Sequence, residues 1–227
     1  MLGSTLIRKT VFLLMAMSLS ISITAQSNVV EKKPFEGVIR FLKVTLSDTI
    51  EFAYFVKGNK VKLVSYDKCI AQESKQEFLI FDLKKKRITA VKPTMRMYSA
   101  LQLRPYVPLS KKEFRIIKSD NKKFILGHQC IQWRIKNLKE NSEIAYWVND
   151  DYNYSFFVPM LKLWNRIEKS AQYYLQISGN EGLFPFQSTE RTFLRDFKLD
   201  MQVIKITEKS LPDHIFEIPK SYINYDQ

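Results

Sequence analysis

The sequence predicts a mainly β domain of the α+β class, in which a curved antiparallel sheet forms a half-open barrel and one main amphipathic helix packs on its concave face. Three observations predict this fold. Apolar and polar residues alternate with a period of two in several segments. Aromatic residues are abundant, with 11 Tyr and 16 Phe, as expected for half-buried strands. Only residues 159–178 show a clear helical spacing of apolar residues.

The first 25 residues are expected to be a signal peptide outside the fold. Arg8 and Lys9 precede the apolar run at residues 11–23, and Ala25 offers a small residue at the cleavage point. This run is shorter than the roughly 20 apolar residues of a membrane span. We therefore expect an exported protein, periplasmic or outer-membrane-associated, with no transmembrane segment after signal removal. Residues 26–227 are expected to form a single domain.

The first half of this domain is predicted to consist of successive strands. The clearest turn contains Gly58 and Asn59, which accept the positive φ angles of a tight hairpin. A lysine-rich turn at residues 84–87 joins a second pair of strands. The predicted strands cover residues 35–46, 50–56, 61–66, 77–83 and 87–91.

In the second half, a hairpin is predicted around Asp120 and Asn121, and residues 143–148 form a further strand. The last long strand alternates up to Val203, where the apolar positions change to Ile204 and Ile206. A change of parity predicts a bulge or a strong bend.

The predicted helix carries apolar residues on one face and basic or amide residues on the other. Pro159 stands at a permitted first-turn position, and residues 178–180 supply the signals that end the helix. A helix with one apolar face must cover another apolar surface, and the concave face of the sheet is the natural partner. The apolar positions are Met160, Leu163, Trp164, Ile167, Ala171 and Tyr174.

The chain is basic, with a net charge of +13. Loss of Arg8 and Lys9 with the leader would leave 34 basic and 23 acidic residues, a charge of +11. In an exported protein the natural anionic partners are lipid headgroups, lipopolysaccharide or acidic proteins, and nucleic acid is not expected. The alternative is that lysines beside turns keep the strand edges soluble.

The segment ILGHQCIQWRI, residues 125–135, brings together a histidine and a cysteine. Strand alternation places His128 and Cys130 on the same, more polar face, with side chains about 6–7 Å apart. Cys130 is expected either to form a disulfide with Cys69, as an oxidising compartment permits, or to remain a free packed thiol. A zinc site with His214 would lack the compact ligand spacing of known sites, so no metal or cofactor is expected.

Catalytic motifs are missing from the sequence. It contains no Gly-x-Ser-x-Gly, no His-Glu-x-x-His and no glycine-rich phosphate loop. A cysteine and a histidine two residues apart on one strand do not reach hydrogen-bond distance without distortion. We therefore expect a protein that is not an enzyme.

Four segments together resemble an exported, β-rich family of unknown function from Gram-negative envelopes, distantly similar to the LolA/LolB-like lipoprotein carriers. The resemblance implies a half-open antiparallel barrel with a helical lid over an apolar cavity, and it covers nearly all of residues 26–227. No catalytic residues are assigned in that family, so it implies none here. The segments are YFVKGNKVKL (54–63), ILGHQCIQWRI (125–135), AYWVNDD (145–151) and FEIPKSY (216–222).

Two functions are consistent with this fold. The first is a carrier or binding module for a lipid, an acyl chain or a lipoprotein, held in an apolar cavity between sheet and helix. The second is an envelope protein-protein interaction or assembly module with a filled core. The candidate cavity residues, whose alternative role is plain core packing, are Ile131, Trp133, Met160, Leu163, Trp164, Ile167, Phe197, Leu199 and Met201.

Asp48, Thr49 and Ile50 resemble the Asp-Ser/Thr-apolar tripeptide that some Gram-negative bacteria O-glycosylate on exported proteins. The resemblance implies Thr49 as a glycosylation site.

Overall fold

The computed structural model describes residues 32–166 and 168–225. The predicted leader, residues 1–25, lies outside them. In the described part of the chain, twelve strands form one unclosed sheet, which is antiparallel except where β12 pairs with β6. The strands are β1 (Gly37–Thr45), β2 (Thr49–Lys57), β3 (Lys60–Tyr66), β4 (Phe78–Asp82), β5 (Arg87–Lys92), β6 (Met97–Ala100), β7 (Phe114–Ile125), β8 (His128–Asn137), β9 (Ser142–Asn149), β10 (Phe184–Arg191), β11 (Phe197–Glu208) and β12 (Ile223–Asn224).

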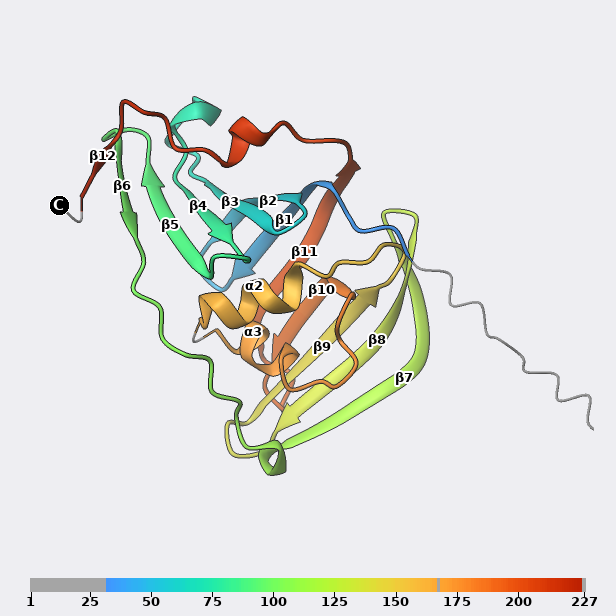
Figure 1. The fold of residues 1–227 in the computed structure, drawn as a ribbon. Coiled ribbons are helices and arrows are strands. Elements are labelled where there is room, and N and C mark those ends of the chain that lie inside the picture. Colours follow the sequence, from blue (N-terminus) through green and yellow to red (C-terminus); the bar gives the residue numbers. More distant parts are fainter. Residues whose placement is uncertain (1–31, 167, 226–227) are drawn as a thin grey trace, which may run out of the picture. The chain divides into compact units, whose positions relative to one another are not determined.

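The sheet consists of two meanders joined at its centre. The strand order is β12-β6-β5-β4-β3-β2-β1-β11-β10-β9-β8-β7, so β1 of the first meander pairs with β11 of the second. Residues 101–110 connect β6, near one edge, to β7 at the other edge, across the open side of the curved sheet (Figure 1). Asn165 Nδ2 donates to the carbonyl oxygens of Arg104 and Pro105, at 3.3 and 3.2 Å, which attaches this connection to the helical region.

Two short helices lie against the concave face of the sheet (Figure 1). They are α2 (Phe157–Trp164) and α3 (Lys169–Tyr174). This confirms the predicted fold class of a half-open barrel with a helical element on its concave face. The predicted helical segment is interrupted, because Asn165 adopts the left-handed conformation at φ 47° and ψ 46° and ends α2. In the described residues no helix is long and apolar enough to cross a bilayer.

The predicted irregularity in the last long strand is confirmed. Arg40 of β1 pairs with Lys205, whereas the next residue, Phe41, pairs with Val203, so Ile204 is the extra residue of a β-bulge. The bulge turns Ile204 outwards, where 37% of its surface is exposed, while Val203 is 2% exposed. The apolar residues therefore change from odd to even positions in the sequence because the backbone contains one extra residue at Ile204.

The predicted hairpin around Asp120 and Asn121 is wrong. β7 continues to Ile125, and the turn consists of Leu126 and Gly127, with φ angles of 53° and 82°. These two positive φ angles suit a two-residue hairpin turn. Residues 119–121 instead form an irregularity opposite Gln132 between the paired residues Lys118–Trp133 and Lys122–Ile131.

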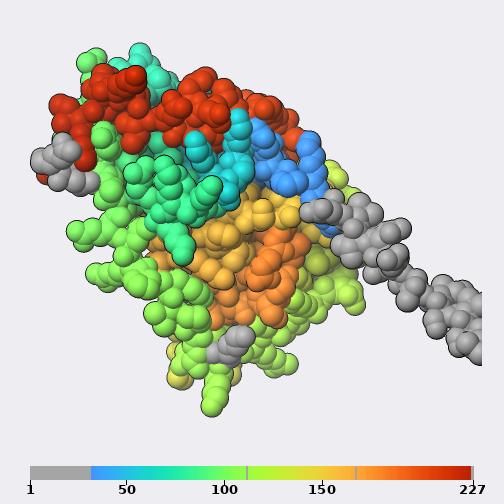
Figure 2. Space-filling model, viewed as in Figure 1, coloured from blue at the N-terminus to red at the C-terminus, as the bar shows by residue number. Residues whose placement is uncertain are grey.

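The main core fills the space between the concave face and the helices. Figure 2 shows α2 and α3, in yellow and orange, filling the opening between the two meanders. A smaller cluster lies on the convex face, where Leu211 and Phe216 near the C-terminus cover Val38 and Ala53. The short helix η3 (Asp213–Phe216) belongs to this cover. Both faces of the first meander are thus partly buried, one by α2 and the other by η3.

Candidate functional site

A pocket of about 220 Å³ lies between the concave face of the central strands and the helices. Its walls come from β1, β2, β3, β9, β10, β11, α2, α3 and the segment between the helices. The lining residues are Phe41, Lys43, Phe52, Tyr54, Leu63, Tyr146, Phe157, Leu161, Trp164, Arg166, Glu168, Ser170, Ala171, Tyr174, Phe184, Pro185, Ser188, Met201, Gln202 and Val203.

Aromatic rings form most of the inner wall. Alternation along β1 and β2 points Phe41, Phe52 and Tyr54 inwards, and Phe41 stacks on both neighbours with ring centroids 5.5 and 4.9 Å apart. On the opposite side, Phe157 of α2 meets Phe184 of β10 edge-on at 4.6 Å. Rings held on several different elements give the pocket a rigid apolar wall.

Charged side chains lie at one end of the pocket. Lys43 Nζ donates to Glu168 Oε1, which links β1 to the segment between α2 and α3. The Arg166 guanidinium lies over the Trp164 ring, 4.4 Å from its centroid. Arg166 is exposed, whereas the Lys43 side chain is only 22% exposed. The pocket therefore has apolar walls and a charged mouth with two cations and one carboxylate.

Three tyrosines line the pocket as neutral groups, because burial raises the pKa of Tyr54, Tyr146 and Tyr174 well above the usual value. Tyr146 Oη donates to the carbonyl oxygen of Ser170 at 2.7 Å, and Tyr174 Oη donates to that of Leu183 at 3.2 Å. In the part of the chain that the structure describes, no hydrogen bond engages the Tyr54 hydroxyl. Tyr54 is thus a polar group of the wall that a ligand can use.

Of the nine candidate cavity residues, Trp164 and Met201 line this pocket. Met160 is fully buried in the core beside it, and Leu163 packs against the same core. Ile167 lies outside the described residues. Trp133 and Ile131 on β8, and Phe197 and Leu199 on β11, are placed away from the pocket lining.

Sequence reasoning missed the charged mouth and the wall of the first meander. The signal was present, because Phe52 and Tyr54 alternate on one predicted face and Lys43 shares the parity of Phe41. Nothing local indicates that β1 lies at the centre of the sheet, where these side chains face the helices. Their role depends on the pairing of β1 with β11.

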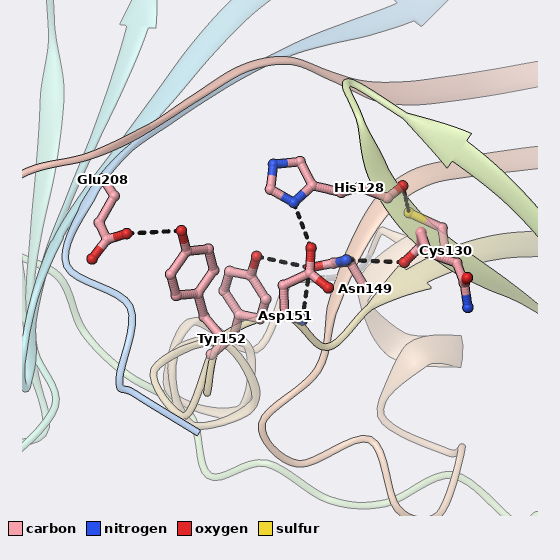
Figure 3. Close-up of polar contacts among 8 residues, drawn as sticks. His128, Cys130, Asn149, Asp151, Tyr152 and Glu208 are labelled. Carbon is pink, nitrogen blue, oxygen red and sulfur yellow. Dashed lines mark hydrogen bonds and ion pairs between the residues drawn. The ribbon is translucent and has the colours of Figure 1, made fainter. Parts of the chain in front are cut away.

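His128 and Cys130 form part of a structural cluster (Figure 3). His128 Nδ1 lies 2.5 Å from Asp151 Oδ2, and its ring meets Phe186 edge-on at 5.3 Å. Asn149 Nδ2 donates to the Gln129 carbonyl at 3.0 Å, which ties the end of β9 to β8. These contacts hold the loop after β9 against the start of β8.

Cys130 is not placed as a nucleophile. It is fully buried, and its thiol donates to the backbone carbonyl of His128 at 3.7 Å (Figure 3). Burial raises the pKa of the Cys130 thiol to about 12, and the Asp151 carboxylate adds to this rise. The thiol therefore stays protonated and unreactive at neutral pH.

The structure does not contain the expected disulfide. Cys69 is an exposed free thiol in the loop after β3, and Cys130 is a buried free thiol on β8. Five strands, β2, β1, β11, β10 and β9, separate β3 from β8 in the sheet, so the two sulfurs lie in different meanders. Among the described residues, no group of three or more His, Cys, Asp or Glu side chains is placed to hold a metal ion.

The family described as "Domain of unknown function (DUF4412)" matches residues 35–222. Among solved structures, the MucA/MucB complex of Pseudomonas aeruginosa matches with a TM-score of 0.51 and 7% identity, over 82% of this chain and 56% of that one. The chain thus spans just over half the length of the matched chain in the MucA/MucB complex. The similarity shows a shared fold.

Two further solved structures are more distantly similar. An uncharacterized conserved protein from Thermus thermophilus has a TM-score of 0.47 and 6% identity, over 83% of this chain and 90% of that one. A domain from Vibrio parahaemolyticus, described as outer membrane lipoprotein-sorting, has a TM-score of 0.31 and 6% identity, over 80% and 88% of the two chains. No curated protein matches the sequence.

Proposed function

The chain belongs to the DUF4412 family of domains of unknown function, and we propose that it is a non-enzymatic binding or carrier protein of the cell envelope. Its ligand is an acyl chain with an anionic head, as in a fatty acid, a lipid or the acylated end of a lipoprotein. The observation that carries the proposal is the pocket on the concave face, in which aromatic walls lead to a charged mouth at Lys43, Arg166 and Glu168.

The size of the pocket supports a single chain. A cavity of about 150 Å³ is enough to hold benzene, and sites for drug-sized ligands begin at about 300 Å³. A volume of about 220 Å³ lies between these values. We expect one acyl segment to occupy the pocket, with the rest of a larger lipid remaining outside.

The mouth supports an anionic head group. Lys43 and Arg166 supply two cations beside one carboxylate, Glu168. A bound anion competes with Glu168 for Lys43, and Arg166 is exposed and can turn towards the ligand. The Tyr54 hydroxyl supplies a hydrogen-bond donor within the apolar wall.

Extraction of the purified protein with organic solvent, followed by mass spectrometry, tests this function, together with uptake of a fluorescent fatty acid. Ala171→Phe adds bulk inside the pocket and is expected to abolish uptake. Ala71→Phe adds the same bulk at an exposed loop position and is the matched control. Absence of a copurified lipid together with no fatty-acid uptake by the wild type would contradict the proposal.

The proposed location is the periplasm or the outer membrane, after cleavage behind Ala25. Residues 26–227 would then be the exported domain. Cell fractionation and the mass of the mature protein test this part, because cleavage at this site leaves Gln26 as the first residue. A protein recovered from the cytoplasm with residues 1–25 attached would overturn it.

The second candidate function is an envelope assembly module, and the edge strand β7 favours it. This strand has twelve residues, and it presents Phe124 with 72% of its surface exposed. MucB, which shares the fold, was solved with MucA bound. Crosslinking in cells followed by mass spectrometry distinguishes the two functions, since a module of this kind captures one stoichiometric protein at β7 and leaves the pocket empty.

A further inference from the structure

A second hollow, of about 490 Å³, lies on the opposite side of the sheet from the acyl pocket. It lies over the ends of β2–β5 that adjoin the β2–β3 and β4–β5 turns, and η3 forms one wall. Cross-strand pairs place its residues on one face: Lys60 pairs with Asp82, and Asp82 with Arg87. The adjacent residues Val61 and Phe81 point to the concave core. We call this region the basic hollow.

The basic hollow carries an excess of positive charge. Its lining contains five cations, Lys57, Lys60, Lys84, Lys85 and Arg87, and two carboxylates, Asp82 and Asp213, a net charge of +3. The cations come from three strands, β2, β3 and β5, and from the turn between β4 and β5, so the fold brings together residues 57–60 and 84–87.

One of the five cations is already engaged. Lys57 Nζ lies 3.0 Å from Asp213 Oδ1 and donates to the Leu211 carbonyl at 2.6 Å, which fixes the C-terminal segment as a wall. Within the described residues, none of the other four cations lies within salt-bridge distance of a carboxylate. Their charge is therefore available to a ligand.

The floor of the basic hollow is well packed. Ile80 and Phe216 are 8% and 6% exposed, and Thr89, which pairs with Ile80, is 6% exposed. A packed floor with the exposed cations Lys84, Lys85 and Arg87 at its rim can surround a ligand, which a flat lysine-rich surface does not do. Lys123 lies outside the basic hollow, and its ammonium group is already occupied. It donates a hydrogen bond to Gln187 Oε1 and lies 4.4 Å from the centroid of the Trp147 ring.

We propose that the basic hollow binds a phosphate group on a small molecule or lipid headgroup. A phosphate monoester carries up to two negative charges and three acceptor oxygens, which suits several converging cations better than a single carboxylate does. Arg87 supplies the planar fork that matches two phosphate oxygens. The volume exceeds that of a bare phosphate and leaves room for the group that carries it.

The test compares the wild type with a triple variant, Lys84→Gln, Lys85→Gln and Arg87→Gln. The matched control, Lys68→Gln, Lys122→Gln and Lys198→Gln, removes the same charge from exposed positions outside the hollow. Calorimetry with inorganic phosphate and glycerol 3-phosphate measures soluble binding. Flotation with phosphatidylcholine vesicles, with and without phosphatidic acid, measures binding to a lipid headgroup. Thermal unfolding checks that each variant is folded.

The hollow variant is expected to lose about tenfold or more in affinity for the probe that binds, with the control within about twofold of the wild type. Binding of glycerol 3-phosphate identifies a soluble ligand, and binding only to phosphatidic acid vesicles identifies a lipid source. Equal losses in both variants, unchanged affinity in the hollow variant, or no binding of any probe by the wild type would overturn the proposal. Ala171→Phe acts on the other face and should leave phosphate binding unchanged, so the acyl pocket is tested separately.

Discussion

Lys43 of β1 and Glu168 of the segment between α2 and α3 form an ion pair at the mouth of the pocket. The pair joins the centre of the sheet to the helical cover. Its side chains are 22% and 40% exposed, so solvent reaches the pair and its contribution to stability is small. In the proposed function, the pair sets the charge that an anionic ligand would meet at the mouth of the pocket.

Changes to the two partners should act in opposite directions on ligand affinity. Lys43→Met removes a cation and is expected to weaken fatty-acid binding by about threefold to tenfold. Glu168→Gln releases Lys43 for the ligand and is expected to strengthen binding. Displacement of a fluorescent fatty acid measures both, and a fatty alcohol is the neutral control. Weaker binding in both variants would show that the pair only maintains the shape of the mouth.

The tyrosine hydroxyls separate binding from stability. Tyr54→Phe removes a hydroxyl with no partner in the described residues, so binding should weaken while the free energy of unfolding stays unchanged. Tyr146→Phe breaks the hydrogen bond to the Ser170 carbonyl and should lower the free energy of unfolding by about 1 kcal/mol. Denaturant unfolding and fatty-acid titration measure the two effects. A stability loss in Tyr54→Phe would mean that its hydroxyl is engaged inside the protein.

The two cysteines should differ in reactivity. Cys69 is exposed and is expected to react with a maleimide in the native protein, whereas buried Cys130 should react only after unfolding. Mass spectrometry after labelling with and without denaturant measures this difference. Loss of both free thiols in protein isolated under oxidising conditions, restored by reduction, would instead support a Cys69–Cys130 disulfide.

The Cys130 thiol should also make stability depend on pH. Its pKa is about 12 in the folded protein and near the ordinary value of 9.0 when unfolded. The folded state thus holds the proton more tightly, so this contribution is fully present below pH 9.0 and is lost as the pH rises towards 12. The free energy of unfolding of the wild type should fall more steeply above pH 9.0 than that of Cys130→Ala. Equal slopes would show that the thiol titrates alike in both states.

The bulge in β11 predicts unequal effects at neighbouring positions. Val203→Ala creates a cavity in the core and should cost about 2 kcal/mol of unfolding free energy. Ile204→Ala affects a partly exposed side chain and should cost much less. Chemical denaturation measures both. Equal costs would contradict the assignment of Ile204 as the extra residue.

Thr49 begins β2 beside the turn in which the Thr45 amide donates to the Asp48 carbonyl at 2.8 Å. Its side chain is partly exposed. We expect a glycan here in the native host, seen as an increase of intact mass that Thr49→Ala removes. An intact mass equal to that of the bare mature chain would exclude the modification.

Local patterns predicted much of the first meander and the bulge. Alternation identified the inward face of Phe52 and Tyr54, and the change of parity located the irregularity at Ile204. Both follow from the two-residue period of a strand, which is a property of neighbouring residues.

The remaining features depend on contacts or conformations that no local pattern indicates. The turn at Leu126 was missed because a leucine rarely adopts a positive φ angle, whereas the Asp120-Asn121 pair has common turn residues. The end of α2 depends on Asn165, whose side chain also binds the connection at residues 101–110. Lys43 and Glu168 meet only after the sheet and the helices are assembled.

The central pairing of β1 with β11 also has a consequence during synthesis. Gly37 of β1 pairs with Glu208 of β11. The backbone hydrogen bonds on this edge of β1 can therefore form only after β11 has been synthesised. Until residue 208 is available, the early meander carries an unpaired strand edge of the kind that recruits strands from other molecules. Truncated or stalled chains should therefore aggregate, and a holding chaperone that shields β1 would raise the yield of folded protein.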